Sequence, residues 1–240
     1  MIILARFVCL VCGYLFGIIQ TAYIYGRLHG IDIRQHGSGN SGTTNALRVL
    51  GKKAGLIVFL GDLLKGVVAC SLTHIILDMV NLPGVSDNKY LFVLYIGFGV
   101  VLGHNFPFYM QFKGGKGIAA TSGMIIGLWD WRLIVILLAV FIISVAVTKY
   151  VSVGSILIMS GFFILYTIFA IMGDYNFADR AKLIESIVVA GVIAGLAIFR
   201  HRANIKRLIA ESGLISSIFL PSGLICSSVI RRLTSPPSIK

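Results

Sequence analysis

Charged residues are scarce in this sequence: Asp, Glu, Lys and Arg make up 12% of its 240 residues, whereas hydrophobic residues make up 57%. Soluble domains carry about 25% charged residues. A water-soluble fold of this length could not bury so much apolar surface, because much of a small domain stays exposed. A lipid bilayer can take up that surface. The composition therefore excludes an ordinary soluble enzyme and indicates an integral membrane protein that forms one compact bundle.

Acidic residues are the scarcer sign: nine Asp and Glu stand against 21 Lys and Arg, which gives a net charge of +12 at pH 7. In a soluble protein this charge would favour nucleic acid, but here the basic residues lie in the gaps between apolar segments. No basic stripe interleaves with exposed aromatic residues, so we expect no nucleic acid partner. Membrane topology explains the charge, and anionic lipid head groups or phosphorylated substrates are the expected partners.

Several signatures of catalytic and metal sites are missing. The sequence contains no G-x-S-x-G and no H-E-x-x-H. The cysteine pair Cys9 and Cys12 has no second pair and no nearby histidine, whereas a zinc site needs about four ligands. We therefore expect no metal and no cofactor, and we interpret the cysteines as small hydrophobic residues packed between helices.

Seven apolar segments are candidates for transmembrane helices, which need about 20 apolar residues, or fewer where a helix is short. The fourth is the weakest, because it is short and contains glycine. Two G-x-x-x-G pairs, Gly13/Gly17 and Gly191/Gly195, predict close helix packing. The segments are residues 2–25, 54–80, 90–110, 117–128, 133–148, 153–172 and 184–199.

The distribution of Lys and Arg decides whether the fourth segment counts. With seven spans, twelve Lys and Arg of the connecting segments fall on one side of the membrane and five on the other. With six spans this asymmetry disappears. The positive-inside rule therefore predicts seven spans, with the basic loops cytoplasmic and the N-terminus outside. We expect an all-α integral membrane protein, a bundle of about seven short transmembrane helices with cytoplasmic substrate-binding loops, over residues 1–212, and an atypical C-terminal extension over residues 213–240.

The first candidate site is the run from Gly37 to Asn45, GSGNSGTTN. Alternate glycines let backbone N–H groups converge on an anion, which larger side chains would block. Asn45 is a candidate N-cap for a short helix from Ala46, whose N-terminus favours negative charge. Arg48 in the first turn could bind a phosphate with two hydrogen bonds. A flexible polar connector explains the run equally well.

The second candidate, KGGKG from Lys113 to Gly117, opens the short fourth segment. It lacks the spacing of a P-loop, so nucleotide hydrolysis is not supported. A lysine such as Lys116 among glycines at a helix start nevertheless suits phosphate binding, whereas a basic juxtamembrane anchor accounts for Lys113 alone. Just upstream, His104 in GHNFP is either a site residue or a polar residue at the membrane interface.

The third candidate, RHRANIKR from Arg200 to Arg207, follows the last apolar segment. His201 and Asn204 are three residues apart and are predicted to share a helical face. An ordinary positive-inside cluster explains the Arg and Lys of this run, but it does not require His201 or Asn204.

Two further polar pairs lie at the start of an apolar segment or inside one. Ser152 and Ser155 stand at the start of the sixth segment, where they either bind a substrate oxygen or cap the helix, which is the safer interpretation. Asp62 and Lys65 lie three residues apart inside the second segment. Because ionisable residues in a membrane are costly and usually paired, we interpret Asp62 and Lys65 as a buried pair that supports the site.

Six segments occur together and in order: GSGNSGTTNALRVLGKK, D-x-x-KG, GHNFP, FKGGKG, VSVGS and HRANIKRL. Together they resemble the acyl-phosphate:glycerol-3-phosphate acyltransferase (PlsY) family, from about Gly37 to Glu211. The His-x4-Asp pair of many other glycerolipid acyltransferases is absent. The resemblance implies a bacterial inner-membrane enzyme of phospholipid biosynthesis. It would move a fatty acyl group from acyl phosphate to the sn-1 hydroxyl of glycerol 3-phosphate, giving lysophosphatidic acid and phosphate, without acyl-CoA or acyl carrier protein as direct donor.

The resemblance also implies partners and site residues. The partners are glycerol 3-phosphate, acyl phosphate and membrane lipids, and an association with the enzyme that produces acyl phosphate is compatible with them. A structural glutamate of the family corresponds to Glu211, whereas Ser41 and Thr43 stand where the family usually has Pro and Ala. The expected catalytic residues are Ser38, Arg48, Lys116, His201 and Asn204. The expected substrate- and phosphate-binding residues are Gly37, Gly39, Asn40, Gly42, Asn45, His104, Gly114, Gly115, Gly117, Ser152 and Ser155.

A transporter of phosphorylated small molecules is the alternative function, since such proteins are also basic and have broken helices. A transporter should carry polar residues at mid-membrane in both halves of the chain, and here Asp62 and Lys65 are the clear examples. A third class, a lipid-binding scaffold, would not need the Gly-Ser-Gly loop. The clustering of the other motifs on one predicted face favours the enzyme.

Overall fold

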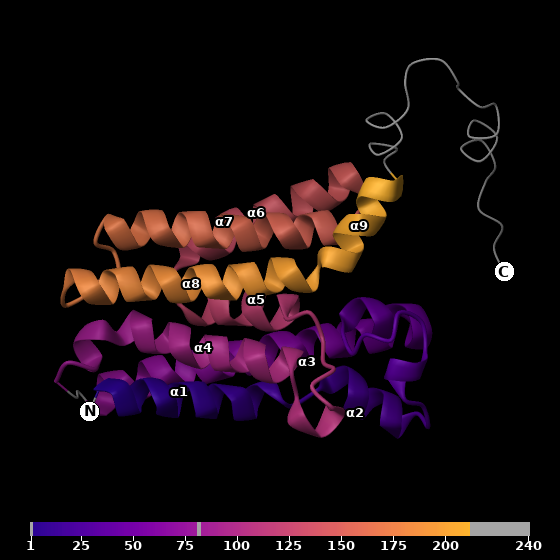
Figure 1. The fold of residues 1–240 in the computed structure, drawn as a ribbon, viewed down its shortest axis with the longest axis horizontal. Helices are drawn as coiled ribbons and strands as arrows, with labels where there is room; N and C mark the ends of the chain where they lie inside the picture. Colours follow the sequence, from indigo (N-terminus) through magenta and orange to yellow (C-terminus); the bar gives the residue numbers. More distant parts are fainter. Residues whose placement is uncertain (1, 81–82, 212–240) are drawn as a thin grey trace, which may run out of the picture. The chain divides into compact units, whose positions relative to one another are not determined.

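A computed structural model describes residues 2–80 and 83–211, and the regular elements within them are helices (Figure 1). Residues up to His201 form one compact unit, and the last helix belongs to a second unit, which is described by itself. The predicted extension over residues 213–240 lies outside the described residues. The helices are α1 (Ile2–Gly17), α2 (Thr21–Leu28), α3 (Thr43–Val80), α4 (Lys89–Asn105), α5 (Ile118–Gly127), α6 (Trp131–Thr148), α7 (Val151–Ile171), α8 (Arg180–Arg200) and α9 (Arg202–Glu211).

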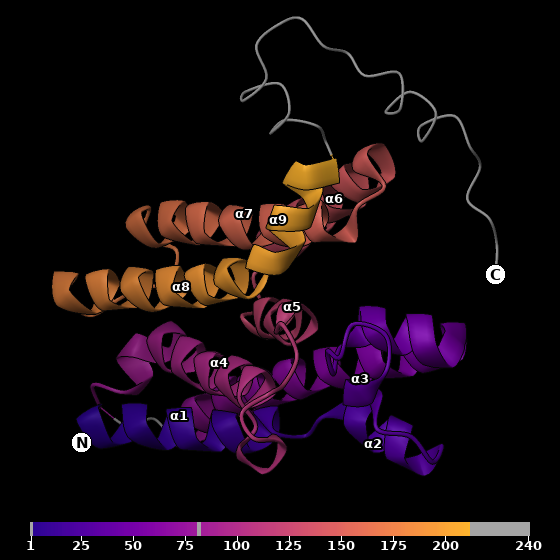
Figure 2. The same cartoon turned by 45° about the vertical axis from the view of Figure 1, so that its right-hand side comes forward.

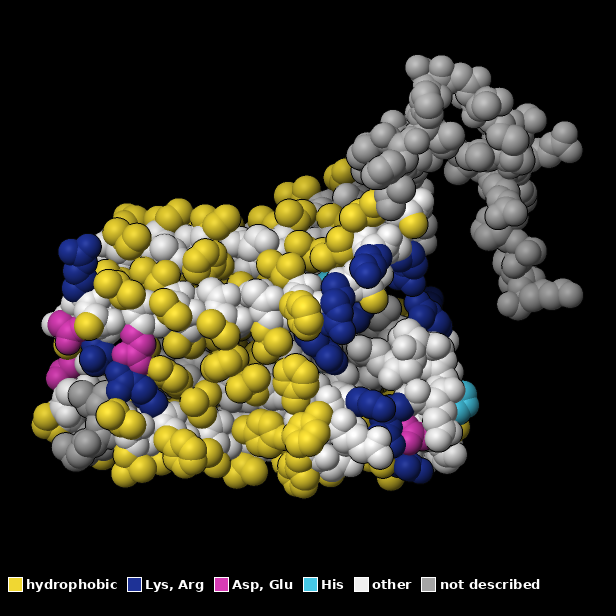
Figure 3. Space-filling model, viewed as in Figure 1, with side chains coloured by type: hydrophobic (Ala, Val, Ile, Leu, Met, Phe, Trp, Pro, Cys, Tyr) yellow, Lys and Arg dark blue, Asp and Glu magenta, His cyan; other side chains and the backbone are white. Residues whose placement is uncertain are grey.

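Six helical segments of the described chain are long and apolar enough to cross a membrane, which agrees with the predicted all-α membrane bundle. Hydrophobic side chains cover the flanks of the bundle, and charged side chains gather at its two ends (Figure 3). Exposed apolar residues of this kind are stable in contact with lipid tails. The six segments are Ile3–Leu28, Thr43–Val80, Ser86–Met110, Trp131–Thr148, Val151–Ile171 and Arg180–Arg200.

The fourth predicted segment forms α5, which packs against α3 and α4 (Figure 2). Its 10 residues rise about 15 Å, half of a hydrocarbon core of roughly 30 Å. The loop before α5 is bonded to Arg200 at the C-terminal end of α8. After α5, Asp130 accepts a hydrogen bond from Tyr175, just before the N-terminal end of α8. The short helix and its flanking loops therefore connect the two ends of the bundle, although α5 alone is too short to span.

Helices α1 and α4 run parallel and touch along glycines. A Cβ atom at Gly13 would lie 2.0 Å from the carbonyl oxygen of Ile96, and one at Gly103 would lie 2.3 Å from that of Tyr14. The predicted close packing at Gly13 is thus confirmed, because only glycine lets the two backbones approach this far. The same prediction is wrong for Gly195, because no atom of the residues that the structure describes lies within 4 Å of its Cβ position.

Helix α3 begins at Thr43, before the predicted helix start at Ala46, and its helical backbone is interrupted at Gly51, with φ 87° and ψ −178°. A positive φ favours glycine, which has no Cβ to clash. The interruption separates a short helical part from the transmembrane part, as expected. Asn45 lies inside the first turn, however, so the prediction that it is the N-cap is wrong.

Candidate functional site

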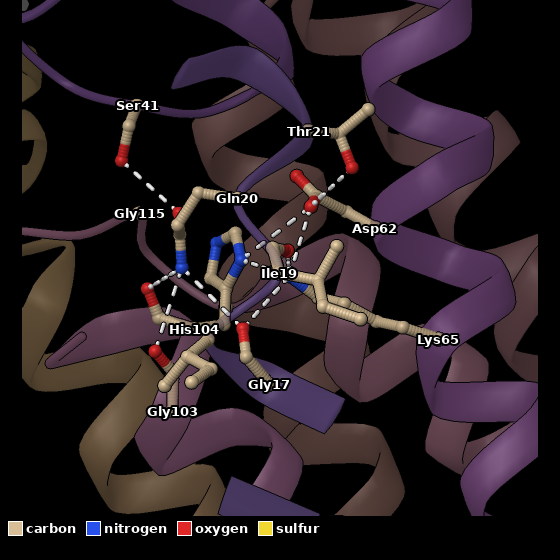
Figure 4. Close-up of polar contacts among 12 residues, drawn as sticks. Gly17, Ile19, Gln20, Thr21, Ser41, Asp62, Lys65, Gly103, His104 and Gly115 are labelled. Carbon is tan, nitrogen blue, oxygen red and sulfur yellow. Dashed lines mark hydrogen bonds and ion pairs between the residues drawn. The ribbon is translucent and has the colours of Figure 1, made fainter. Parts of the chain in front are cut away.

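The first transmembrane segment is broken where α1 ends, and its end carbonyls meet a buried lysine. Nζ of Lys65 donates hydrogen bonds to the carbonyl oxygens of Gly17 (3.2 Å) and Ile19 (2.8 Å). A helix end leaves carbonyls without intrahelical partners, and a cation there also interacts favourably with the helix dipole. Lys65 on α3 therefore stabilises the break between α1 and α2 (Figure 4).

Lys65 also joins Asp62 and His104 into one buried cluster (Figure 4). Its Nζ lies 3.0 Å from Oδ1 of Asp62 and 2.9 Å from Nδ1 of His104. The side chains of Lys65, Asp62 and His104 are 4%, 1% and 3% exposed, respectively. The predicted buried pair is confirmed, and His104 lies inside the protein instead of at the interface.

The Gly37–Asn45 loop is shaped by the amide of Asn45. Its Oδ1 accepts a hydrogen bond from the backbone N–H of Ser38 (2.8 Å), and its Nδ2 donates to the carbonyl oxygen of His36 (3.0 Å). Gly37 has φ 61°, and a Cβ there would lie 2.3 Å from Oδ1 of Asn45. Asn45 thus closes the loop from inside, while Ser38 and Arg48 are exposed.

A buried serine connects this loop to the break in the first transmembrane segment. Oγ of Ser41 donates to Oε1 of Gln20 (3.3 Å), and Nε2 of Gln20 donates to the carbonyl oxygen of His104 (2.9 Å). The Gly37–Asn45 loop is therefore two hydrogen bonds away from His104. Gln20 is not among the residues predicted from the sequence. A polar residue directly after an apolar run is the feature of the sequence that could have indicated its role.

The Lys113–Gly117 loop lies against the end of α4. The backbone N–H groups of Gly114 and Gly115 donate to the carbonyl oxygens of Asn105 and His104, both at 3.1 Å. A Cβ at Gly115 would lie 2.0 Å from Nε2 of His104, so the imidazole lies directly beside this glycine. Because these two N–H groups bind α4, phosphate binding here would rest on the Lys116 side chain and on the N-terminus of α5.

The end of α8 holds the other side of that loop. Nη2 of Arg200 donates to the carbonyl oxygens of Gly114 (3.1 Å) and Gly115 (2.8 Å), and its guanidinium lies over the ring of Phe106. The interpretation of Arg200 as part of a positive-inside cluster does not predict this contact. No local pattern could reveal it, since the partners are 86 and 85 residues apart in sequence.

His201 follows Arg200 and is buried, with Nδ1 2.8 Å from the carbonyl oxygen of Ala197. Burial lowers the pKa of His201, the bond to Ala197 opposes this, and the positive charges of Lys116 and Arg200 lower it further. The helix ends here: His201 is the C-cap of α8, and α9 begins at Arg202. The predicted shared helical face of His201 and Asn204 is therefore wrong, because the two residues are not on one continuous helix.

The remaining candidate residues differ in their surroundings. Ser155 is buried at the start of α7 and its Oγ donates to the carbonyl oxygen of Val151 (2.8 Å), a bond within its own helix. Ser152 is half-buried in the same first turn. The N-cap of α7 is Tyr150, so the interpretation of Ser155 as a helix cap is wrong. The side chain of Glu211, the proposed structural glutamate, lies outside the described residues.

The structure thus brings Gly37–Asn45, Lys113–Gly117 and the end of α8 to one end of the bundle, around the carbonyl oxygen and ring of His104. Lys116 and Arg200 supply positive charge there, and Asp62, the acid of the cluster, is paired with Lys65. Such a site suits an anion. Among the described residues, no group of three or more His, Cys, Asp or Glu could hold a metal ion.

Comparison with known proteins gives concordant matches. A family model described as Glycerol-3-phosphate acyltransferase matches residues 7–211. The chain is 40% identical over 209 residues to the glycerol-3-phosphate acyltransferase of Chlorobaculum parvum, covering 82% of this chain and 90% of the relative. It is 42% identical over 200 residues to that of Clostridioides difficile, covering 83% and 89%.

Two solved structures also match. A crystal structure of PlsY in its glycerol 3-phosphate form has a TM-score of 0.69 and 29% sequence identity, and the match covers 90% of this chain and 99% of that one. The lysophosphatidic acid form has a TM-score of 0.67 and 30% identity, over 86% and 92% of the two chains.

Proposed function

This chain belongs to the glycerol-3-phosphate acyltransferase family, and we propose that it moves a fatty acyl group from acyl phosphate to the sn-1 hydroxyl of glycerol 3-phosphate. The products are lysophosphatidic acid and phosphate. The ligands named for the two similar PlsY structures, glycerol 3-phosphate and lysophosphatidic acid, support this acceptor and this product. Membership in an enzyme family leaves the transporter alternative without support.

One observation carries the proposal: the segments that hold the candidate residues converge at one end of the bundle. Ser41 and Gln20 link the Gly37–Asn45 loop to His104, and the N–H of Gly115 binds the carbonyl oxygen of the same residue. Arg200 then holds Gly115 from the other side. Two phosphate-bearing reactants need a cationic site of this kind.

We assign the substrate phosphates to the cationic side chains at this end. Lys116 and the N-terminus of α5 bind the phosphate of glycerol 3-phosphate. Ser38 and Arg48, exposed on the neighbouring loop and helix, bind the acyl phosphate. His201 is a hydrogen-bonding group for the bound acceptor. The same role for Asn204, which belongs to the second unit, rests on the family resemblance alone.

The reaction needs little from a protein base. The glycerol hydroxyl oxygen attacks the carbonyl carbon of the mixed anhydride, a new ester C–O bond forms, and the C–O bond to phosphate breaks. A phosphate oxygen of the substrate takes the hydroxyl proton. Lys116, Arg48 and His201 stabilise the developing negative charge, and positioning of the two reactants supplies much of the remaining acceleration. Asp62 is unsuited to act as a base, because it is buried and paired with Lys65.

We also propose a bacterial inner membrane as the location, with the N-terminus outside and the site at the cytoplasmic face. The excess of Lys and Arg on the segments at the site end supports this orientation under the positive-inside rule. This orientation requires an odd number of membrane crossings. The passage of the chain along α5 from one end of the bundle to the other supports such a number.

The test uses the purified full chain in lipid vesicles with a long-chain acyl phosphate and labelled glycerol 3-phosphate. We expect labelled lysophosphatidic acid when acyl phosphate is the donor. We expect none when acyl-CoA or acylated acyl carrier protein replaces acyl phosphate. Production of lysophosphatidic acid from either of those donors, or none from acyl phosphate, would reject the proposal.

A further inference from the structure

We propose that Lys65 is a positioning residue for this reaction: its ammonium group fixes the ring of His104 in the tautomer that carries the proton on Nε2, beside the Gly114–Gly117 loop. His104 can then donate a hydrogen bond on the loop side and cannot accept a proton there. The link to catalysis rests on the proposed function, whereas the tautomer assignment does not.

The assignment follows from counting donors and acceptors around Nζ of Lys65. Three neighbours can only accept: the carbonyl oxygens of Ile19 (2.8 Å) and Gly17 (3.2 Å) and Oδ1 of Asp62 (3.0 Å). One of the three is the carboxylate of Asp62, whose side chain is 1% exposed. Beside a neutral amine this carboxylate would be an unpaired buried charge, which is strongly destabilising. Lys65 is therefore charged, with three N–H donors.

The fourth neighbour of Nζ is Nδ1 of His104, at 2.9 Å. Four neighbours share the three N–H groups, so one N–H serves two of them. If Nδ1 carried a proton, that proton would be directed at a cation 2.9 Å away. An ammonium group has no lone pair to accept a hydrogen bond. Nδ1 of His104 is therefore the acceptor, and in a neutral imidazole the proton must then sit on the other nitrogen, Nε2.

Nε2 of His104 faces the loop. A Cβ built on Gly115 would lie 2.0 Å from Nε2, so this nitrogen is directed at the side of Gly115 that a larger residue would fill (Figure 4). Lys116, the proposed phosphate ligand, is the next residue. The single proton of the imidazole is thus placed against the loop that grips the anionic acceptor.

Asp62 keeps this arrangement charged. An unpaired buried cation is strongly destabilising, and Oδ1 of Asp62, which also accepts from Oγ1 of Thr21 (3.2 Å), supplies the counter-charge. Among the described residues, the titratable groups around Lys65 are Asp62 and His104, and the charge of Arg200 at the end of α8 acts on His104. Asp62 therefore acts through Lys65, and Lys65 acts through His104.

Nitrogen NMR on the full chain tests the tautomer directly. The protein is labelled with ¹⁵N-histidine in lipid vesicles, and the signals of His104, one of five histidines, are those missing in His104→Gln. We expect a protonated Nε2 and an unprotonated Nδ1, and Lys65→Met should abolish this preference. A protonated Nδ1 in the unsubstituted protein overturns the inference, whether or not the protein makes lysophosphatidic acid.

Two matched substitutions test the link to the reaction. The amide of His104→Gln can place a donor near Nε2, whereas the amide of His104→Asn lies near Nδ1 and leaves the loop side empty. We expect His104→Asn to lose about 100-fold in kcat/KM, the size of a small misplacement of reactants, and His104→Gln to retain most of its activity. Equal losses in two variants that insert and unfold like the unsubstituted protein would refute the donor role. Lys89→Met, which removes a lysine from the far end, is the control for Lys65→Met.

Discussion

Nη2 of Arg200 lies 2.8 Å from the carbonyl oxygen of Gly115 and donates a hydrogen bond to it. The same nitrogen donates to the carbonyl oxygen of Gly114. The last residue of α8 thus fixes the loop whose two N–H groups are already bound to the end of α4. With both sides of its backbone held, this loop can present Lys116 and the start of α5 in one orientation, which is the preorganisation that charge stabilisation requires.

Arg200→Lys should therefore impair catalysis without unfolding the protein. Lysine has no planar guanidinium to lie over Phe106 while serving two carbonyls. We expect kcat/KM for glycerol 3-phosphate to fall by about 10- to 100-fold, measured as lysophosphatidic acid formed in vesicles. Arg180→Lys, at the other end of the same helix, is the control and should be neutral; equal effects of the two substitutions would contradict the role of Arg200.

Gly115→Ala should abolish activity by a local collision. The added Cβ would lie 2.0 Å from Nε2 of His104, so either the loop or the imidazole must move. Combining Gly115→Ala with His104→Ala removes the obstacle and should restore binding of glycerol 3-phosphate, measured by calorimetry, although not full turnover. Normal activity of Gly115→Ala alone would show that the ring does not lie beside this glycine.

Gly13→Ala should lower the stability of the bundle. Its Cβ would meet the backbone of Ile96 at 2.0 Å, and overpacking of a tight contact costs about 1–3 kcal/mol. Gly195→Ala is the matched control, because its Cβ position is open. Thermal unfolding in detergent should show a lower midpoint for Gly13→Ala and an unchanged or slightly higher one for Gly195→Ala. The reverse order is incompatible with the α1–α4 contact.

Asn45→Ala should damage the site more than the fold. The substitution removes three hydrogen bonds that shape the Gly37–Asn45 loop, each contributing about 1 kcal/mol. Asn45→Asp keeps the acceptor for Ser38 but turns an oxygen toward the carbonyl oxygens of Ile33 and His36, so its kcat/KM for acyl phosphate should be no higher than that of Asn45→Ala. The exposed neighbour Thr44 provides the control, Thr44→Ala. Full activity of Asn45→Ala would mean that loop shape is unimportant.

The pH dependence of stability should report on His201. Burial, aided by the charges of Lys116 and Arg200, lowers its pKa below the ordinary value of about 6.5. The unfolded chain then binds the proton more readily, so the contribution of His201 is complete above about pH 6.5 and is lost as the pH falls below it. The unfolding midpoint should drop less between pH 6.5 and pH 5 in His201→Gln than in the unsubstituted protein. Parallel curves would refute the shift.

The sequence predicts the helices and the buried ion pair because both depend on local chemistry. Apolar runs must lie in lipid, and two opposite charges three residues apart in such a run can reach each other, as Asp62 and Lys65 do. The sequence does not predict which distant groups these charges serve. The carbonyls of Gly17 and Ile19 become partners of Lys65 only because the first helix breaks. Gln20, the N-cap of α2, marks that break in the apolar run, but it does not reveal the partner.

Short motifs were least predictive where backbone geometry decides. G-x-x-x-G marks a tight contact at Gly13 and open space at Gly195, and the difference lies in which face of the helix meets a neighbour. Asn45 has the residue type of a helix cap but braces a loop, since its amide reaches back to Ile33 and His36. The three-residue spacing of His201 and Asn204 suggests one helical face, but it could not reveal that α8 ends between them, with His201 as its C-cap.

Lys116 is the anchor of the acceptor phosphate in the proposed site, and one pair of variants tests this role directly. Lys116→Met and Lys113→Met each remove one positive charge from the same loop, but Lys113 is exposed, before the glycines that pack on His104. Binding of glycerol 3-phosphate and formation of lysophosphatidic acid should be lost in Lys116→Met and retained in Lys113→Met. Retention of both in Lys116→Met would contradict the account.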